Sequence, residues 1–600
     1  MRLRTSNAIR WPAALPAALC CALLALGLLP AVAGAHAQLE STSPERGAVV
    51  PTEPKSVSFH FGEPVTGTAG AIRVFDSTGS RVDDGASFHP GGDQTTYAVG
   101  LRPGLPKGTY TATYRVVSAD THIVTGGFVF SIGTASARPG ETVGQLLAGQ
   151  RTGSITSTAF SLVRAVQYAA IGIAAGTLLF LLAVWLPALA RVAGTDRTWP
   201  AASRAFTGRL RAVLITTAIA GLLSGLAGLA LEGAEAAGVS FTAAIDRTIL
   251  GDVLGTRFGV VWLSAAGAWL VLAVGAALLL RPRAAGAPAL HDDGTPARPW
   301  PAALLCIPAA ALLALPTLAG HASVQHPVGL FAPVNLVHVA AMSAWFGGLV
   351  ALVAVLPQAT RRLEGPERTR LLAATLARFS PIALGAVIVL LLSGIVESLI
   401  EIDALPQLIH TAFGRAVLVK IVLLLVLIGL GALNRQRTMP QLRALAANHQ
   451  PPGEAGLVLR RTLRIEVALI AVVLLVTGAL AGYAPAKQAA TGPVSVTTSL
   501  GPAQMTLDVD PATVGANEIH IYLLNPRTGA QFTGTKKLTV TAAQQRKGIG
   551  PLTLDAQPSG PGHYTVPDAV LGARGTWTID VTAQVSTFDE YERAVKVPIR

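Results

Sequence analysis

Eight long apolar stretches constrain this chain more than any other feature of its sequence. They fall at roughly residues 160–186, 211–232, 258–280, 301–319, 331–357, 379–401, 415–433 and 464–484. Each is close to the ~20 apolar residues that an α-helix needs to cross a bilayer. Only 13% of the 600 residues are charged, against about 25% in soluble domains. The sequence therefore predicts a membrane domain of eight helices and excludes a wholly soluble protein.

The distribution of basic residues predicts how these helices are oriented. The formal net charge is +13, and nineteen arginines lie in or beside the first, third, fifth and seventh connections between the apolar stretches. The opposite connections hold only Arg247, Arg257 and Arg415. Lys and Arg gather in cytoplasmic loops of membrane proteins. We therefore expect a multi-pass protein of the cytoplasmic (inner) membrane with both termini outside the cytoplasm, and the charge gives no reason to expect a nucleic-acid partner.

The amino terminus has the pattern of a secretory signal peptide over residues 1–35. Basic residues precede an apolar run from Ala13 to Leu29, and Ala33-Gly34-Ala35 supplies the small residues of a cleavage site. Cleavage there would make His36 the first residue of the mature chain. The alternatives are cleavage after Ala37 and an uncleaved anchor.

Residues 36–133 change to short alternating runs separated by turn residues, which predicts a small all-β sandwich or barrel. A linker at 134–158 would join it to the membrane domain at 159–485. Within the β domain, an exposed amino group on His36 and its own imidazole can chelate a metal together. Asp120 and His122, two residues apart, project from one face of a strand. Two imidazoles, an amine and a carboxylate suit Cu(II), although a D-x-H pair alone is a weak signal.

This domain resembles the CopC family of periplasmic copper-binding proteins. The matching motifs are His36-Ala37-Gln38-Leu39, Ser43-Pro44-Glu45-Arg46-Gly47, Phe61-Gly62-Glu63-Pro64-Val65 and Ser118-Ala119-Asp120-Thr121-His122 followed by Gly126. The resemblance implies that His36, Asp120 and His122 bind Cu(II), with Glu63 as a nearby carboxylate. The chain departs from those relatives that hold a second, Met-rich Cu(I) site, because this domain contains no methionine. We expect His60 and His89 to be solvated histidines.

Polar residues inside the apolar stretches gather toward their outer ends. His321 follows Pro316, which we expect to interrupt its helix. In the fifth stretch, Asn335, His338 and Met342 recur at helical spacing and share one face, and Ser393 and Glu397 of the sixth could face them. One interpretation is a copper path through His321, His338 and Met342, from imidazole to thioether. Ordinary helix packing explains the same spacing and stays an alternative.

The membrane region resembles the CopD family of membrane copper proteins. The motifs are Leu318-Ala319-Gly320-His321-Ala322, Asn335-Leu336-Val337-His338, Ala344-Trp345-Phe346-Gly347-Gly348, Arg378-Phe379-Ser380, Ser393-Gly394, Gly414-Arg415 and Val419-Lys420. The resemblance implies that copper, as Cu(I) or Cu(II), is transferred across the inner membrane.

After a linker at 486–493, β-type alternation returns over 494–600 and predicts a second extracytoplasmic sandwich. It loosely resembles the YtkA-like domains through Gly562-His563-Tyr564 and Gly575-Thr576-Trp577. His520 and His563 could bind metal, but we expect them to be ordinary surface histidines.

The sequence thus predicts a multi-domain membrane protein: an N-terminal all-β domain, an eight-helix transmembrane α bundle and a C-terminal all-β sandwich. Its expected function is copper binding outside the membrane and copper transfer across it, in uptake or resistance, with no catalytic residues and no P-loop match. The expected partners are the copper ion, the bilayer and an extracytoplasmic copper donor or acceptor protein. The alternatives are a membrane haem oxidoreductase and a copper sensor or scaffold without transport.

Overall fold

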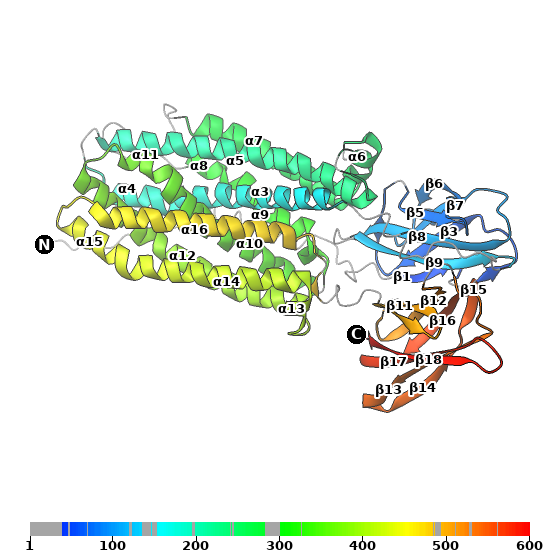
Figure 1. Ribbon diagram of the computed structural model, residues 1–600. Coiled ribbons are helices and arrows are strands. Elements are labelled where there is room, and N and C mark those ends of the chain that lie inside the picture. The colour runs from blue at the N-terminus through cyan, green and yellow to red at the C-terminus, as the bar shows by residue number, and fades with distance from the viewer. Residues whose placement is uncertain are drawn as a thin grey trace.

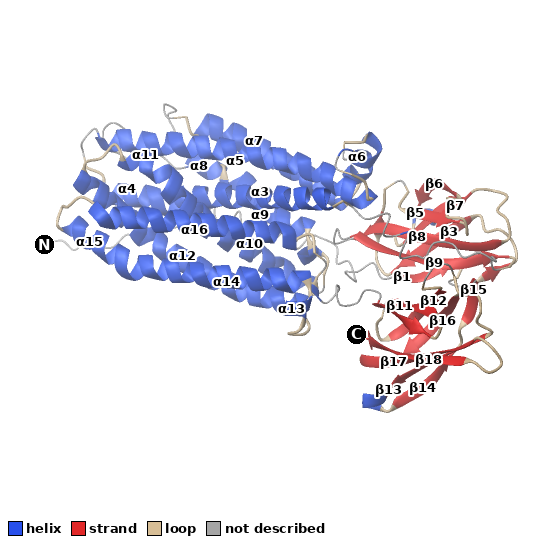
Figure 2. Cartoon of the chain, viewed as in Figure 1, coloured by secondary structure: helices blue, strands red, loops and turns tan. Residues whose placement is uncertain are grey.

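The protein is described by a computed structural model over residues 39–45, 48–68, 70–118, 123–134, 146, 153–194, 198–240, 242, 245–281, 300–325, 327–483, 485–486, 494–510, 512–526, 531–560 and 562–599. These residues form a first β domain, a helical bundle and a second β domain. Both β domains lie at the same end of the bundle (Figure 1). Figure 2 shows that the long helices gather in the bundle and the strands in the two β domains.

The first β domain is a sandwich of two sheets, as the alternating sequence predicted. One sheet has the strand order β1-β3-β7-β6, and the other has the order β2-β9-β8-β4 with β5 paired to β8. In β3, the side chains of Val57, Phe59 and Phe61 are buried, and those between them are more exposed. The strands are β1 (Leu39–Ser43), β2 (Val49–Val50), β3 (Ser56–Phe61), β4 (Val65–Thr66), β5 (Ile72–Phe75), β6 (Asp83–Phe88), β7 (Thr96–Leu101), β8 (Gly108–Ser118) and β9 (Ile123–Ile132).

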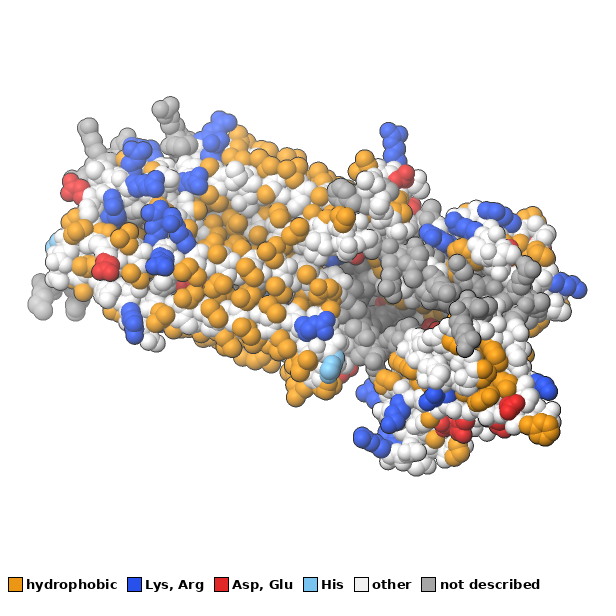
Figure 3. All heavy atoms as spheres, in the orientation of Figure 1, with side chains coloured by type: hydrophobic (Ala, Val, Ile, Leu, Met, Phe, Trp, Pro, Cys, Tyr) orange, Lys and Arg blue, Asp and Glu red, His pale blue; other side chains and the backbone are white. Residues whose placement is uncertain are grey.

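The bundle contains eight helical spans among the described residues, each long and apolar enough to cross a membrane, which confirms the predicted number. They are Ser154–Val192, Thr198–Ala237, Arg257–Leu279, Pro301–Ala319, Val328–Thr360, Gly365–Glu401, Ala412–Ala447 and Gly453–Leu480. Several of these spans are longer than the apolar stretches of the sequence, because a helix can continue through a polar or basic turn at its end. On the face shown in Figure 3, apolar side chains cover the middle of the bundle, and blue Lys and Arg side chains gather at the end far from the β domains.

The spans are built from the following helices, with short helices connecting them. These are α3 (Ser154–Leu179), α4 (Leu186–Val192), α5 (Thr198–Ala237), α6 (Arg247–Leu254), α7 (Arg257–Leu279), α8 (Trp300–Leu304), α9 (Cys306–Ala319), α10 (Val328–Val350), α11 (Leu356–Thr360), α12 (Gly365–Glu401), α13 (Gln407–His410), α14 (Ala412–Leu433), α15 (Met439–Ala447) and α16 (Gly453–Leu480). A short helix, η4 (His321–Ser323), follows α9.

Prolines shape these spans without breaking them. Pro187, Pro357 and Pro440 each follow a wider, π-helical segment, because a proline lacks the N–H that an α-helical turn needs. The prediction that Pro316 interrupts its helix is wrong: α9 continues through Pro316 and ends at Ala319, and the next residue, Gly320, has an extended conformation. One missing hydrogen bond near the end of a packed helix is tolerated in a bundle.

Close backbone packing fixes α10 against α3 in the centre of the bundle. A Cβ atom on Gly176 would lie 1.8 Å from the carbonyl oxygen of Ser343, and one on Gly347 would lie 2.5 Å from that of Gly172. Only glycine permits this approach. α10 also packs against α9 and α12.

The second β domain is also a two-sheet sandwich, as predicted. Its sheets have the orders β10-β11-β12-β16-β15 and β14-β13-β17-β18, and Trp577 and Met505 are fully buried between them. The strands are β10 (Val494–Leu500), β11 (Ala503–Asp510), β12 (Gly515–Leu524), β13 (Lys537–Gln544), β14 (Ile549–Leu554), β15 (Gln557–Gly560), β16 (His563–Leu571), β17 (Gly575–Gln584) and β18 (Glu590–Ile599).

Candidate functional sites

The candidate Cu(II) ligands of the first β domain fall beside described strand ends. His36, Asp120 and His122 themselves lie outside the described residues, before β1 and between β8 and β9. Glu63 is described: it lies between β3 and β4 and is only 1% exposed. The structure therefore describes the strand ends on either side of these three residues, together with Glu63.

Strand pairing brings these surroundings to one end of the sandwich. Leu39, at the start of β1, pairs with Phe61 at the end of β3. From Phe61 the chain runs through Glu63 into β4, where Val65 pairs with Ser118 at the end of β8. The segments that flank His36, Glu63 and Asp120 are thus neighbours, although they lie far apart in the sequence.

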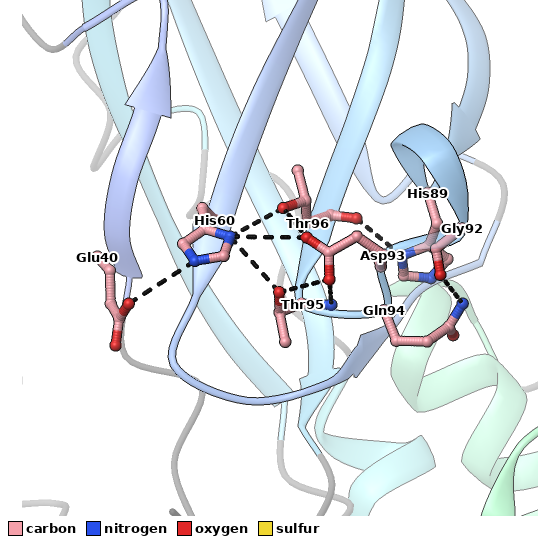
Figure 4. Close-up of polar contacts among 8 residues, drawn as sticks. All are labelled: Glu40, His60, His89, Gly92, Asp93, Gln94, Thr95 and Thr96. Carbon is pink, nitrogen blue, oxygen red and sulfur yellow. Dashed lines mark hydrogen bonds and ion pairs between the residues drawn. The ribbon is translucent and has the colours of Figure 1, made fainter.

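A polar cluster lies at the same end of the domain, centred on His60 of β3 (Figure 4). Nδ1 of His60 lies 2.8 Å from Oγ1 of Thr96 and 3.9 Å from Oδ2 of Asp93, and its Nε2 lies 3.8 Å from Oε2 of Glu40. Hydrogen bonds from Thr96 and Thr95 lower the pKa of Asp93 to about 2, so its carboxylate stays ionised. The His60 side chain is 42% exposed, in agreement with a solvated histidine.

His89 has a different role from His60 in the same cluster. Its Nδ1 lies 2.8 Å from the carbonyl oxygen of Thr96 and 3.1 Å from that of Asp93. The imidazole therefore bridges two backbone groups and holds the turn between β6 and β7. It is partly buried rather than fully solvated.

This end of the first β domain contacts the bundle through Arg115 of β8. Its Nε donates to the carbonyl oxygen of Ala236 at 3.1 Å, and its Nη2 donates to that of Glu235 at 2.6 Å. Both acceptors lie in the last turn of α5, where helix carbonyls lack intrahelical partners and attract cations. Arg115 precedes Ser118 by three residues, so the edge beside Asp120 lies near the bundle.

A chain of polar contacts runs between three helices in the end of the bundle nearest the β domains. Oγ1 of Thr317 on α9 donates to Oδ1 of Asn335 on α10 at 2.8 Å, and Nδ2 of Asn335 donates to Oε1 of Glu397 on α12 at 3.0 Å. One turn further along α10, Nδ1 of His338 lies 2.8 Å from Oγ of Ser393 and 3.8 Å from Oε2 of Glu397. The prediction that the polar residues of α10 face Ser393 and Glu397 of α12 is therefore confirmed.

Met342 and His321, the other two residues of the predicted copper path, lie in different positions from His338. The sulfur of Met342 packs against Gly172 of α3, 3.2 Å from where a Cβ would lie, whereas His338 faces α12. His321 lies in η4, which packs against both α9 and α10. Lys420 on α14 adds a positive charge that interacts with Glu397. The cluster is thus centred on His338 and Glu397, with Met342 on the adjoining face of α10.

Sequence reasoning missed the acidic partner of Arg164. Nη2 of Arg164 lies 3.8 Å from Oε2 of Glu232, and both side chains are buried between α3 and α5. Next to this pair, Oγ of Ser224 donates to Oε1 of Gln167 at 2.7 Å. A buried arginine in an apolar span needs a counter-charge, so its presence was the signal that could have led to Glu232.

The prediction that His520 and His563 are surface histidines is wrong, because each is only 6% exposed. Nδ1 of His520 lies 3.1 Å from Nε2 of His563. Burial lowers the pKa of His563 well below its usual range, and nearby His520 adds to this. For His520, burial acts to lower the pKa, but the Glu518, Asp508 and Asp510 carboxylates together outweigh it and the net shift is upward.

Three family models match the chain. The CopC domain matches residues 39–133, the Copper resistance protein D-like N-terminal domain matches residues 155–329, and Copper resistance protein D matches residues 373–480. The first match covers the first β domain, and the other two cover most of the bundle.

Curated relatives extend these matches. The chain is 27% identical over 577 residues to Copper transport protein CutJ of Bacillus subtilis (strain 168), covering 95% of this chain and 96% of that protein. It is 31% identical to Copper resistance protein C of Escherichia coli over 18% of this chain and 94% of that protein. Inner membrane protein YebZ of Escherichia coli (strain K12) is 28% identical over 45% of this chain and 82% of that protein.

Among solved structures, the crystal structure of CopC from Methylosinus trichosporium OB3b matches with 29% identity, 18% coverage of this chain, 98% coverage of that chain and a TM-score of 0.15. The sequence matches, taken with the order of domains along the chain, show that the protein belongs to the copper-handling CopC and CopD families, with both domains fused in one polypeptide.

Proposed function

We propose that the first β domain captures Cu(II) outside the cytoplasm and delivers copper to the bundle, which carries it across the membrane. The observation that carries this proposal is the contact of Arg115 with the end of α5. It holds the edge that flanks Asp120 and His122 against the same end of the bundle that contains His338 and Glu397. Relatives named for copper transport and copper resistance support the same function.

The proposed capture site consists of His36, Asp120 and His122, with Glu63 as an adjacent carboxylate. The convergence of Leu39, Glu63 and Ser118 at one end of the sandwich supports it. Imidazole, amine and carboxylate ligands hold Cu(II) in a tetragonal geometry. We infer that a domain of this kind binds copper as cargo, without catalysing a reaction.

The proposed membrane path begins near His321, passes His338 and continues at Met342. Support comes from the polar chain of Thr317, Asn335 and Glu397, since polar groups inside a span are costly and usually serve a pathway or a ligand. The neighbouring Glu397 carboxylate would offset the charge of a copper ion held by His338. Met342 packs against Gly172, so passage from His338 to Met342 would run along the interface of α10 with α3 and α12.

The proposed orientation places both β domains outside the cytoplasm. It is supported by the gathering of Lys and Arg side chains at the opposite end of the bundle (Figure 3). Cysteine labelling tests it in a background in which Cys20, Cys21 and Cys306 are all replaced by alanine. An impermeant reagent should label Phe588→Cys, whose parent side chain is 95% exposed, and should not label Arg362→Cys in intact cells. Labelling of Arg362→Cys would contradict the orientation.

The transport step is tested with full-length protein in liposomes that contain a copper indicator. Copper added outside should reach the indicator with wild-type protein and should not with His338→Ala. A protein that binds Cu(II) but moves no copper would support a sensor or scaffold instead. A haem absorption band in the purified protein would support the oxidoreductase alternative.

A further inference from the structure

The second β domain carries a polar row on a sheet face that is buried. Strand register places His520 opposite both Asp508 and Thr565, and places His563 opposite Tyr522. Cross-strand partners share a face, and this face is opposite to the one that bears the core residue Ile521. His520 and His563 are each 6% exposed, and Glu518 and Thr565 are each 2% exposed. Such polar burial is costly unless the groups satisfy one another or hold a ligand.

Three donor atoms in this row form a nearly equilateral triangle. Nδ1 of His520 and Nε2 of His563 are 3.1 Å apart, and Oγ1 of Thr565 is 3.4 Å from each of them. A point equidistant from three atoms with these spacings lies about 1.9 Å from each, close to the ~2.0–2.1 Å of a metal–imidazole bond. The spacing therefore fits three ligands of one small metal ion as well as it fits a shared hydrogen bond.

The surroundings of the triangle favour a cation. Oε1 of Glu518 lies 3.3 Å from Nε2 of His520, so the carboxylate is paired with the nitrogen that faces away from the triangle. Metal-binding histidines usually have a carboxylate or carbonyl at their second ring nitrogen. Oδ1 of Asp508 is buried and makes no hydrogen bond among the residues described, and its charge acts on His520. Two carboxylates thus lie beside two imidazoles.

The row is also tied to the first β domain. Oγ of Ser559 donates to Oγ1 of Thr565 at 2.9 Å. The carbonyl oxygen of the same Ser559 lies 3.5 Å from Oγ1 of Thr109 on β8 of the first domain. Figure 1 shows β15 and β16 beside the strands of the first domain. The triangle is therefore close to the interface between the two β domains.

We propose that His520, His563 and Thr565 form a copper site in the second β domain, with Glu518 as a positioning residue for His520. Zinc is less suited, because structural zinc sites take four strong ligands and this one offers two imidazoles and a hydroxyl. Copper accepts imidazole ligands, and Cu(I) accepts low coordination numbers. The choice of copper over other metals rests on the proposed function. The three-donor arrangement rests only on the distances between the donor atoms.

The test uses full-length protein in detergent, with the other candidate ligands removed by His122→Ala and His338→Ala. Cu(I) is supplied with ascorbate and a competing chelator, and bound copper per chain is measured by mass spectrometry. We expect one copper ion per chain in this background and none after a further His563→Ala. His410→Ala, which removes an exposed histidine of α13, should leave binding unchanged. Glu518→Gln should weaken binding about 10–100-fold.

X-ray absorption of the copper-loaded background protein provides a readout that does not depend on the folding of a variant. It should show two imidazole ligands and no sulfur. No copper in the background protein, unchanged copper after His563→Ala, or binding of zinc but not Cu(I) would each overturn the proposal. Flux is measured separately, with wild-type protein in liposomes. Normal wild-type flux together with no copper in the background protein would overturn the site alone. Copper in the background protein together with no wild-type flux would overturn the transport proposal and leave the site standing.

Discussion

The two β domains share a sandwich architecture but place their imidazoles in opposite ways. In the first domain, His60 is 42% exposed, and β8 ends at Ser118, three residues after the Arg115 contact with the bundle. In the second domain, His520 and His563 lie on a sheet face and are each 6% exposed. An exposed imidazole can reach a partner with small movements of the chain, whereas buried imidazoles can do so only when the domains separate or open.

Under the two proposals above, this contrast gives the domains different roles. The first domain would capture copper and pass it on quickly. The second would hold copper for longer, behind a domain interface. The predictions that follow would break or sharpen this distinction.

The largest effect is expected from His122→Ala in the first domain. Loss of an imidazole ligand should lower the Cu(II) affinity of the full chain by more than about 100-fold, beyond the range seen when only a supporting residue is changed. Competition with a Cu(II) chelator, followed by electron paramagnetic resonance, measures it. His89→Ala, which removes a histidine that bridges backbone carbonyls, should have little effect. Equal loss in both variants would mean that the domain was disturbed as a whole.

A second large effect is expected from His338→Ala, which separates capture from passage. Copper flux should fall by at least about tenfold, because the variant removes the imidazole proposed to hold the ion beside Glu397, and a loss of about 1.4 kcal/mol in binding already corresponds to tenfold. Cu(II) binding by the first domain should stay normal. Val337→Ala, which changes a neighbouring side chain that is 41% exposed, serves as the control. Normal flux at wild-type protein level would leave helix packing as the role of His338.

The sequence predicted the parts of this molecule that depend on periodicity. Eight apolar stretches gave eight spans, and alternating runs gave two sandwiches, because burial against lipid or core imposes these patterns locally. Helical spacing also placed Asn335 and His338 toward Ser393 and Glu397. The fate of Pro316 could not be predicted in the same way, since it depends on how neighbouring helices stabilise the end of α9.

Contacts between segments that are far apart in the sequence could not be predicted from local sequence patterns. His520 and His563 lie 43 residues apart, and nothing in their local sequence indicates that β12 pairs with β16. Their burial reversed the expectation of surface histidines. The same holds for Glu232, which meets Arg164 only after α3 packs against α5. A metal site whose ligands come from different strands can be recognised only when the pairing register of those strands is known, and that register is known only from the folded structure.

A smaller effect is expected from Arg115→Ala, which weakens the contact between the capture domain and the bundle. It removes two charge-assisted hydrogen bonds to carbonyls of α5, each contributing about 1.5–3 kcal/mol. We expect copper flux to fall several-fold while Cu(II) affinity is unchanged. Arg102→Ala, at an exposed position in the first domain, is the matched control. If flux were unaffected, the position of the capture edge against the bundle would not matter for transfer.

The smallest effect is expected from Glu63→Gln, and it tests whether the edge of the first domain acts as one site. Glu63 is 1% exposed and lies on the chain between Phe61 and Val65, whose partners flank His36 and Asp120. Removing its negative charge while keeping its shape should lower Cu(II) affinity about tenfold, as for other residues that support ligands from outside the coordination shell. Glu53→Gln is the control, because Glu53 precedes the start of β3 at the opposite end of the strand. A drop in affinity for Glu63→Gln alone would assign the effect to this edge. Equal drops in both variants would point to the net charge of the domain, and no drop in either would remove Glu63 from the site.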